Sequence, residues 1–326
     1  MDSPKVSRSL EKEIESGINT PVAFFIFNRP KFTKKVFEVI RQAKPNKLFV
    51  IADGQRSERP GEDEKCVAAR AIVEQIDWDC EVFRNYSKVN LGCGQRVSTG
   101  ITWVFEQVEE AIILEDDCLP HPTFFSFCHQ LLKKYRNDPK IMSISGTNWL
   151  EQWKPEKQSY HFSFCGGVWG WATWRRAWQG YDYQMKLWVS KETREHIRDF
   201  IADDKQFEAL SNIFSRVYRG EIDTWDYQLI FHYFLHSGIE VVPSVNLISN
   251  IGFGEDATHT KNPYDLRSNL PRHHMSFPLR NPDEIGIDVE YARQLSKKLS
   301  MNSYLRKRGL LGGEMLDREN FLNLTG

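Results

Sequence analysis

The feature that most constrains the fold is a regular alternation, over residues 21–144, of short apolar runs with segments whose apolar residues recur at helical spacing. The first apolar run is PVAFFIF, residues 21–27, and the segment 31–43 that follows it carries Phe32 and Val36 on one helical face. A run that is apolar on both faces is typical of a strand inside a parallel sheet. The alternation therefore predicts an α/β fold, in which a mostly parallel sheet is flanked by helices.

The predicted strands and helices alternate regularly to residue 144, and the alternation becomes irregular beyond residue 150. In the regular part we expect strands at 21–27, 47–52, 80–83, 111–114 and 141–144, and helices at 31–43, 62–76, 95–107 and 122–135. Later in the chain we expect a helical region at 191–218, a buried helix within TWDYQLIFHYFLHSG and a strand at 240–242.

The length and the net charge of the chain limit how many domains it can form and which partners it can bind. With 326 residues, 40% of them hydrophobic, the chain can form one large α/β domain with a sizeable core. We expect a charged leader at 1–19, a central α/β domain at 20–277 and a basic extension at 278–326. The formal net charge of -1 gives no general attraction to nucleic acid, so we expect no nucleic-acid partner.

Cysteine spacing and hydropathy indicate the compartment. The six cysteines form no C-x-x-C pair, which suits reduced thiols and predicts a cytoplasmic location. No run approaches the roughly 18 apolar residues of a membrane-spanning helix. The basic extension carries Leu295, Leu299 and Leu305 among its lysines and arginines. Two interpretations of it stay open: an amphipathic helix on an anionic membrane surface, or a segment packed on the domain.

Polar residues follow three of the predicted strands at the point where each strand ends. Asn28 and Arg29 follow the first strand, Asp53 the second, and the triplet 115–117 the fourth. Ligands of open α/β sheets bind beyond the carboxyl ends of the strands. We therefore expect these residues to gather on one edge of the sheet and to form a binding site.

The triplet Glu115, Asp116 and Asp117 directly follows the apolar run AIIL. Adjacent carboxylates repel one another unless a positive group stands between them, and carboxylate oxygens are the ligands that Mg²⁺ and Mn²⁺ prefer. The alternative is a solvated acidic turn. The sequence has no G-x-x-x-x-G-K-[ST] loop, no H-E-x-x-H and no G-x-S-x-G, and no G-x-G-x-x-G follows the first strand.

The stretch AIILEDDCLPHPTFFSF resembles the metal-binding segment of GT-A-type glycosyltransferases, and in particular of the N-acetylglucosaminyltransferase I group. Other stretches are also similar to segments of that group. They are the first strand with the FNRP that ends it, the IADG at the end of the second strand, and the two later stretches GGVWGWATW and TWDYQ. The resemblance spans roughly residues 20–262. It implies a GT-A-type, Rossmann-like fold and a metal-dependent glycosyltransferase, which moves a sugar from a UDP-sugar to an acceptor hydroxyl with inversion.

The resemblance also implies roles for single residues. Asp117 would bind Mn²⁺ or Mg²⁺, while Glu115 and Asp116 would address the ribose or sugar and the coordination shell. Arg29 would meet the donor diphosphate, and Asp53 the uracil ring. The residues themselves add one candidate for the phosphates, Arg96, which follows the turn formed by residues 92–94.

The catalytic base and a further metal ligand come from the later stretches. Asp226 of TWDYQ would be the general base, but the group has two adjacent aspartates after the tryptophan and this chain has Trp225-Asp226-Tyr227. Asp223 is therefore the second candidate for the base. His259 resembles the C-terminal histidine that many GT-A enzymes add to the metal shell.

Each role has a structural alternative in the sequence. Asp226 stands where a helix N-cap would stand, and Asp53 precedes a glycine, as turn residues do. Arg29 and Arg96 also suit solvated surface positions, and His259 suits a bond to a loop carbonyl. The tryptophans of GGVWGWATW suit packing better than stacking on a sugar.

The functional alternatives are a sugar-phosphate nucleotidyltransferase, a divalent-cation-dependent carbohydrate- or membrane-binding protein without turnover, and a retaining transferase. The first fits poorly, because FNRPKFTKK lacks the glycines of that class. For the transferase we expect a UDP-sugar donor, with UDP-N-acetylglucosamine suggested by the resemblance, and a carbohydrate or lipid-linked acceptor. Such an enzyme of polysaccharide biosynthesis would work in the cytoplasm, with peripheral contact at the inner face of the membrane.

Overall fold

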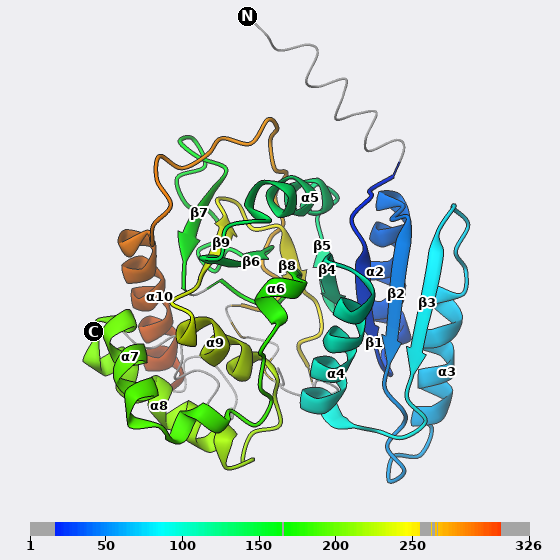
Figure 1. Ribbon diagram of the computed structural model, residues 1–326. Coiled ribbons are helices and arrows are strands. Elements are labelled where there is room, and N and C mark those ends of the chain that lie inside the picture. Colours follow the sequence, from blue (N-terminus) through cyan, green and yellow to red (C-terminus); the bar gives the residue numbers. More distant parts are fainter. Residues whose placement is uncertain (1–16, 165, 255–261, 263–264, 266, 308–326) are drawn as a thin grey trace, which may run out of the picture.

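Eight strands of the described chain form one sheet, in the order β3-β2-β1-β4-β8-β6-β9-β7. The computed structural model (Figure 1) describes residues 17–164, 166–254, 262, 265 and 267–307, with the side chains of 299–307 excepted. The strands are β1 (Val22–Ile26), β2 (Lys47–Ala52), β3 (Glu81–Tyr86), β4 (Glu110–Glu115), β6 (Ile141–Ser145), β7 (Tyr160–Ser163), β8 (Trp171–Trp174) and β9 (Ile239–Pro243).

The sheet is mostly parallel, as the alternation predicts. β3, β2, β1 and β4 run parallel to one another, and β6 runs parallel to β9. Only β8 and β7 are antiparallel to their neighbours in this sheet of the described chain. Helices flank it: α2 (Pro30–Ala43), α3 (Glu62–Val73), α4 (Gly92–Gln107), α5 (Thr123–Tyr135), α6 (Arg175–Trp178), α7 (Lys191–Ile201), α8 (Asp204–Tyr218), α9 (Asp226–Leu235) and α10 (Val289–Lys307).

The first four strands and their helices lie close to the predicted ranges, because local sequence decides them. All five residues of β1 are buried, which explains its apolar character on both faces. Helix α2 begins with Pro30, whose fixed φ suits a helix start, and is followed by Lys44, which caps its end in a left-handed conformation. The predicted strand 80–83 begins one residue later and runs on to Tyr86.

The second half of the sheet is more regular than the sequence indicates. The glycine and tryptophan stretch supplies β8, which lies between β4 and β6 in the middle of the sheet. Trp171 and Trp174 are almost fully buried, so the packing interpretation is confirmed for these two tryptophans, while Trp169 is only partly buried. The predicted helical region 191–218 is divided into α7 and α8, because Ala202 takes a left-handed conformation and the Asp203 side chain caps the next helix.

Helices α7, α8 and α9 form a second, smaller core beside the sheet. The short 3-10 helix η1 (Lys186–Val189) joins them, and Trp188 packs edge-on against Phe214 and Phe231. In Figure 1 these green and yellow helices lie on the opposite side of the molecule from the blue and cyan strands β1 to β3. The loop before α9 reaches back from this cluster toward the sheet.

A separate pair of short strands brings a distant segment to the end of β4. Strand β5 (Cys118–Pro120) directly follows the acidic triplet and pairs antiparallel with β10 (Ile248–Asn250). The backbone N–H of Ile251 also donates to the carbonyl of Asp117, at 2.9 Å. The chain after β10 is thereby fixed beside the triplet.

The first turns of α10 pack on the domain. Tyr291 and Leu295 are buried in a small cluster with Trp149 and Val242, and the Tyr291 ring lies against that of His161 in β7. Leu295 therefore faces the protein. Within the described residues, no helix has the length and apolar character needed to cross a membrane.

Candidate functional site

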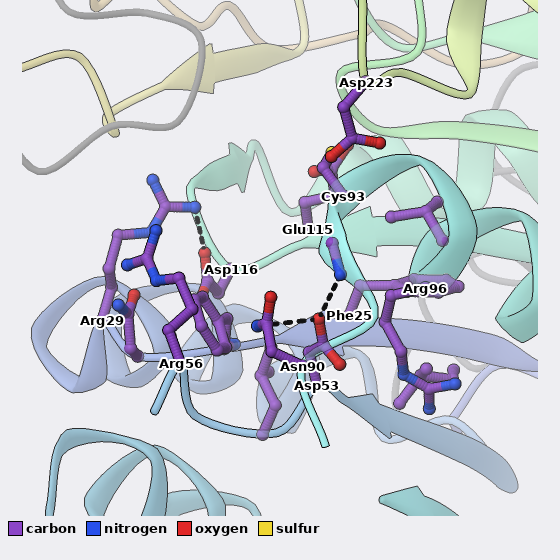
Figure 2. A pocket seen from close by; sticks show the side chains of 16 residues that line it. Phe25, Arg29, Asp53, Arg56, Asn90, Cys93, Arg96, Glu115, Asp116 and Asp223 are labelled. Carbon is purple, nitrogen blue, oxygen red and sulfur yellow. Dashed lines mark hydrogen bonds and ion pairs between the residues drawn. The ribbon is translucent and has the colours of Figure 1, made fainter. Parts of the chain in front are cut away.

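A cavity of about 260 Å³ lies at the carboxyl ends of β1, β2 and β4, against the first turn of α4 (Figure 2). Six of the nine residues singled out from the sequence line it, and they are Arg29, Asp53, Arg96, Glu115, Asp116 and Asp223. Its volume is close to the lower end of the range for small-molecule sites, about 300 Å³ and above. The strand ends thus bring together residues that are far apart in the sequence.

Asp116 ties the end of β4 to the loop after β1. Its carboxylate accepts a hydrogen bond from the backbone N–H of Phe27 at 3.1 Å and forms an ion pair of 2.5 Å with Arg29. The side chain is almost fully buried. Burial, which outweighs the effect of Arg29, raises the pKa of Asp116. Asp116 therefore fixes the position of Arg29 at the cavity wall.

Asp117 shares the same arginine. Its Oδ2 lies 2.9 Å from Nη1 of Arg29, so that the guanidinium stands between the two aspartates. Gly252 packs directly behind this pair, and a Cβ at that position would clash with the carboxylate of Asp117 and with Nη1 of Arg29. Burial acts to lower the pKa of Arg29, but the two acids outweigh it and raise that pKa above its ordinary value.

Glu115 completes a cluster of like charges. Burial, followed by the charge of Asp117, raises the pKa of Glu115 to about 8, and Asp226 adds to the effect. Arg29 acts in the opposite direction. The triplet thus carries three carboxylates, and the guanidinium of Arg29 pairs with two of them, Asp116 and Asp117.

The donor set has the right chemistry for Mg²⁺ or Mn²⁺. Among the residues that the structure describes, no group of three or more His, Cys, Asp or Glu side chains is arranged to hold a metal ion. His259 lies outside the described residues. These ions are commonly held by one or two carboxylates together with substrate phosphates, so Asp117 fits as a ligand of a site that a bound diphosphate would complete.

Asp53 braces the loop that leads into α4. Its carboxylate accepts hydrogen bonds from the backbone N–H groups of Gly54, Leu91 and Gly92 and from Nδ2 of Asn90, at 2.9 to 3.1 Å. Burial raises the pKa of Asp53, although these bonds act to lower it. The turn role proposed as an alternative is thus present, and the contact with a uracil ring stays a prediction.

Arg96 is buried rather than solvated. Its guanidinium donates to the carbonyl of Ala52 at 3.2 Å and to the carbonyl and side-chain oxygens of Asn85 at 2.5 and 3.0 Å. Burial lowers the pKa of Arg96. The solvated surface position given as the alternative is therefore wrong, because the buried guanidinium binds carbonyls at the ends of β2 and β3. A phosphate contact by Arg96 would require these bonds to be exchanged.

Arg56 is a lining residue that the sequence analysis missed. It forms an ion pair with the buried Glu62, which also accepts from Nδ2 of Asn28 at 2.8 Å, and its guanidinium lies 5.4 Å from the ring centre of Phe27. Figure 2 shows Arg29 and Arg56 side by side at one end of the cavity. The signal was the acidic residue Glu62 at the start of a predicted helix, which gives the arginine a fixed partner.

The two candidate bases differ in their surroundings. Asp226 is the first residue of α9, partly buried, and accepts from the Thr224 hydroxyl and from the backbone N–H of Tyr227. Asp223 is exposed and accepts from the backbone N–H of Gly94 at 3.0 Å, at the start of α4. A Cβ on Gly94 would clash with the Asp223 carboxylate. Asp223 thus joins the α9 loop to the cavity wall.

Comparisons with known proteins give little beyond a partial likeness in structure. No protein-family profile matches the sequence, and no curated protein matches it. One similar structure is the mannosyltransferase PcManGT from Pyrobaculum calidifontis in complex with GDP-Man and Mn²⁺, with 13% identity, a TM-score of 0.37 and coverage of 67% of this chain and 69% of that one. A UDP-glucose pyrophosphorylase complexed with UDP-glucose has 12% identity, a TM-score of 0.25 and coverage of 45% and 63%. Likeness at this level assigns no activity.

Proposed function

We propose that the protein is a metal-dependent glycosyltransferase that transfers a sugar from a UDP-sugar, such as UDP-N-acetylglucosamine, to an acceptor hydroxyl. The observation that carries the proposal is the cluster of Glu115, Asp116 and Asp117 at the end of β4, with Arg29 held between the two aspartates at the wall of a cavity. The carboxylates outnumber the guanidinium beside them. Such a site suits a ligand that brings a cation for the carboxylates and phosphate groups for the guanidinium.

Donor binding rests on the residues at the strand ends. Arg29 and Arg56 would hold the diphosphate, since both guanidinium groups are fixed by buried acids and lie at one end of the cavity. Asp117 would hold Mn²⁺ or Mg²⁺, with Glu115 nearby, and the ion would neutralise the charge of the leaving diphosphate. Asp116, which is already bonded to Arg29 and Phe27, would act by positioning Arg29.

Transfer requires a base on the face of the sugar opposite the diphosphate. The acceptor oxygen would bond to the anomeric carbon while its proton passes to the carboxylate of Asp226. The bond from that carbon to the diphosphate would break with the electron pair staying on the diphosphate, next to Arg29. A single displacement of this kind inverts the anomeric configuration. Asp226 is the candidate for this role because it is the first residue of α9 and is partly buried, with its carboxylate hydrogen-bonded to Thr224 and to the backbone N–H of Tyr227.

The remaining proposals concern the surroundings of the enzyme. We propose a carbohydrate or lipid-linked acceptor and a cytoplasmic location, with residues 20–277 as the catalytic domain. Tyr291 and Leu295 are buried in the domain, so the first turns of α10 support packing of the basic extension rather than insertion in a membrane surface. Peripheral membrane contact would have to rest on other basic residues of this extension.

The test is calorimetric titration of the full chain with UDP in two buffers, one containing Mn²⁺ and one containing EDTA. We expect binding that requires the metal, followed by transfer when UDP-sugars and acceptors are screened. Binding that is equal in both buffers would remove the metal assignment. If UDP, GDP, CMP and dTDP all fail to bind in either buffer, the triplet is an acidic turn and the transferase proposal falls.

A further inference from the structure

The side chain of Asn90 has a fixed orientation at the cavity wall. Its Nδ2 donates to Oδ2 of Asp53 at 3.1 Å and to the carbonyl of Gly54 at 2.8 Å. A rotated amide would place its oxygen against these two acceptors, so both contacts require the nitrogen on this side. The amide oxygen, Oδ1, therefore points the other way. Figure 2 shows it directed into the cavity, away from Asp53.

The loop that carries Asn90 is held tightly, so this orientation is preorganised. The backbone N–H of Gly54 donates to the carbonyl of Val89 at 3.3 Å, and a Cβ on Gly54 would clash with the backbone of Val89. The Ser87 hydroxyl donates to the same carbonyl at 2.6 Å. Among the described residues, no hydrogen bond to Oδ1 of Asn90 is present. An oriented acceptor without a protein partner is thus presented to a ligand.

Asp53 cannot easily provide the same acceptor. A carboxylate has about four lone-pair positions, and that of Asp53 already accepts from three backbone N–H groups and from Asn90. A base that bonded to Asp53 would displace one of these donors and leave it without a partner, which costs about 1–3 kcal/mol. Asn90 offers an acceptor at the same wall of the cavity without that loss.

We propose that Oδ1 of Asn90 accepts the ring N–H of a uracil or thymine base, and that Asp53 acts by positioning Asn90. This inference rests on the proposed function, because it names the part of the donor that the site recognises. The ring N3–H of these bases is a donor, whereas N3 of cytosine is an acceptor. The apolar side chains of Phe25, Ile51 and Val97 also line the cavity, which suits a flat base, while Arg29 and Arg56 remain for the diphosphate.

The experiment compares UDP with N3-methyl-UDP in the presence of Mn²⁺, on the wild type and on Asn90→Ala. The methyl group removes the N–H donor and adds the volume of one methyl group at the same position. We expect the wild type to bind N3-methyl-UDP about tenfold more weakly than UDP, since a hydrogen bond is worth on the order of 1 kcal/mol and Asn90 is partly buried. In Asn90→Ala the difference should shrink to less than about threefold.

Comparing two ligands on two proteins distinguishes recognition of the base by Asn90 from a purely structural role of Asn90 in its loop. If Asn90 only supports the loop, Asn90→Ala weakens both ligands equally and the tenfold difference persists, which overturns the inference. Equal binding of the two ligands by the wild type would also overturn it, and that measurement needs no variant. The exposed Asn137→Ala serves as a matched control and should leave both affinities unchanged.

The outcome is distinguishable from failure of the proposed function. If the wild type binds GDP or CDP in preference to UDP and dTDP, the Asn90 assignment is wrong while a nucleotide-sugar site remains. If no nucleotide binds, the proposed function itself is wrong. Circular dichroism of Asn90→Ala should match the wild type, and residual UDP binding shows that the cavity is intact.

Discussion

The two halves of the sheet are built differently, and the difference explains how the site is assembled. Strands β3, β2, β1 and β4 are parallel and follow one another through single helices. Strands β8, β6, β9 and β7 mix antiparallel and parallel pairs, come from distant parts of the chain and include an irregular register between Ile141 and Ser143. The first half supplies most of the cavity. The second half supplies the candidate bases and covers the triplet.

This division predicts a division of labour between donor binding and proton transfer. Arg29, Arg56 and the acidic triplet come from loops after β1, β2 and β4, whereas Asp223 and Asp226 come from the loop before α9 and its first residue. Changes in the first half should therefore alter nucleotide affinity. Changes near α9 should alter turnover while affinity persists.

The largest effect is expected from Asp117→Ala. Removing this carboxylate takes away the proposed metal ligand and one partner of Arg29. Stabilisation of a leaving diphosphate by a metal is worth several kcal/mol, so transfer should fall by about 10⁴-fold and UDP binding should lose its dependence on Mn²⁺. Calorimetry and a product assay measure the two effects. The exposed Asp79→Ala is the control, and metal-dependent binding by Asp117→Ala would exclude Asp117 as the ligand.

The next effect separates the two candidate bases. Asp226→Asn should lower turnover by about 10²- to 10³-fold with UDP affinity unchanged, because the amide cannot accept the acceptor proton. Asp223→Asn should stay within about threefold of the wild type, because an amide oxygen can still accept from the N–H of Gly94. Steady-state kinetics on both variants decide the matter. The reverse result would assign the base to Asp223.

A smaller effect is expected from Gly252→Ala, which tests the contact between the halves. The added Cβ would clash with Asp117 and Arg29, and one of these side chains must move. Breaking a charge-assisted pair is worth about 1.5–3 kcal/mol, so UDP affinity with Mn²⁺ should fall by about 10- to 100-fold. Gly286→Ala, whose Cβ would meet no atom within 4 Å, is the control. Unchanged affinity would show that the pair is not needed for binding.

The smallest effect concerns the stability of the fold at acidic pH, and it comes from a histidine in the second half of the molecule. Burial lowers the pKa of His232 in α9 to about 4, below the ordinary value of 6.5. Protonation therefore favours the unfolded chain, so the stability from neutral His232 is complete above pH 6.5 and is lost as the pH falls toward 4. The shift corresponds to about 3 kcal/mol.

Urea unfolding at pH 7 and at pH 4.5 measures this loss. His232→Gln should lose less free energy of unfolding between the two pH values than the wild type does. The exposed His196→Gln should behave like the wild type. An identical loss in His232→Gln would show that other groups cause the acid sensitivity.

The sequence predicts the first half well, because local patterns decide it. Buried runs such as KLFVIA coincide with a strand, and the strand ends place Arg29, Asp53, Glu115 and Asp116 around one cavity. The position of α4 was less accurate. The helix begins at Gly92 rather than at residue 95, because Asp53 accepts hydrogen bonds from the backbone N–H groups of Leu91 and Gly92 at its start.

The rest of the site depends on contacts between distant residues, which periodicity does not contain. The burial of Arg96 follows from carbonyls at the ends of β2 and β3, and its sequence neighbours do not indicate it. The approach of Gly252 to Asp117 depends on the pairing of β10 with β5. Arg56 was missed because its pairing with Glu62 forms only once the loop after β2 is folded.

The pairing of β10 with β5 also orders events during synthesis of the chain. Proteins emerge from the ribosome N-terminus first, and the parallel half of the sheet is complete once β4 has emerged. The triplet then lacks its neighbour Gly252 and the hydrogen bond from Ile251 until much of the remaining chain has been translated. A nascent or truncated chain that stops before β10 would retain most of the cavity wall but would lack Gly252 and Ile251 beside the triplet, so the proposed activity would appear only in chains translated past β10.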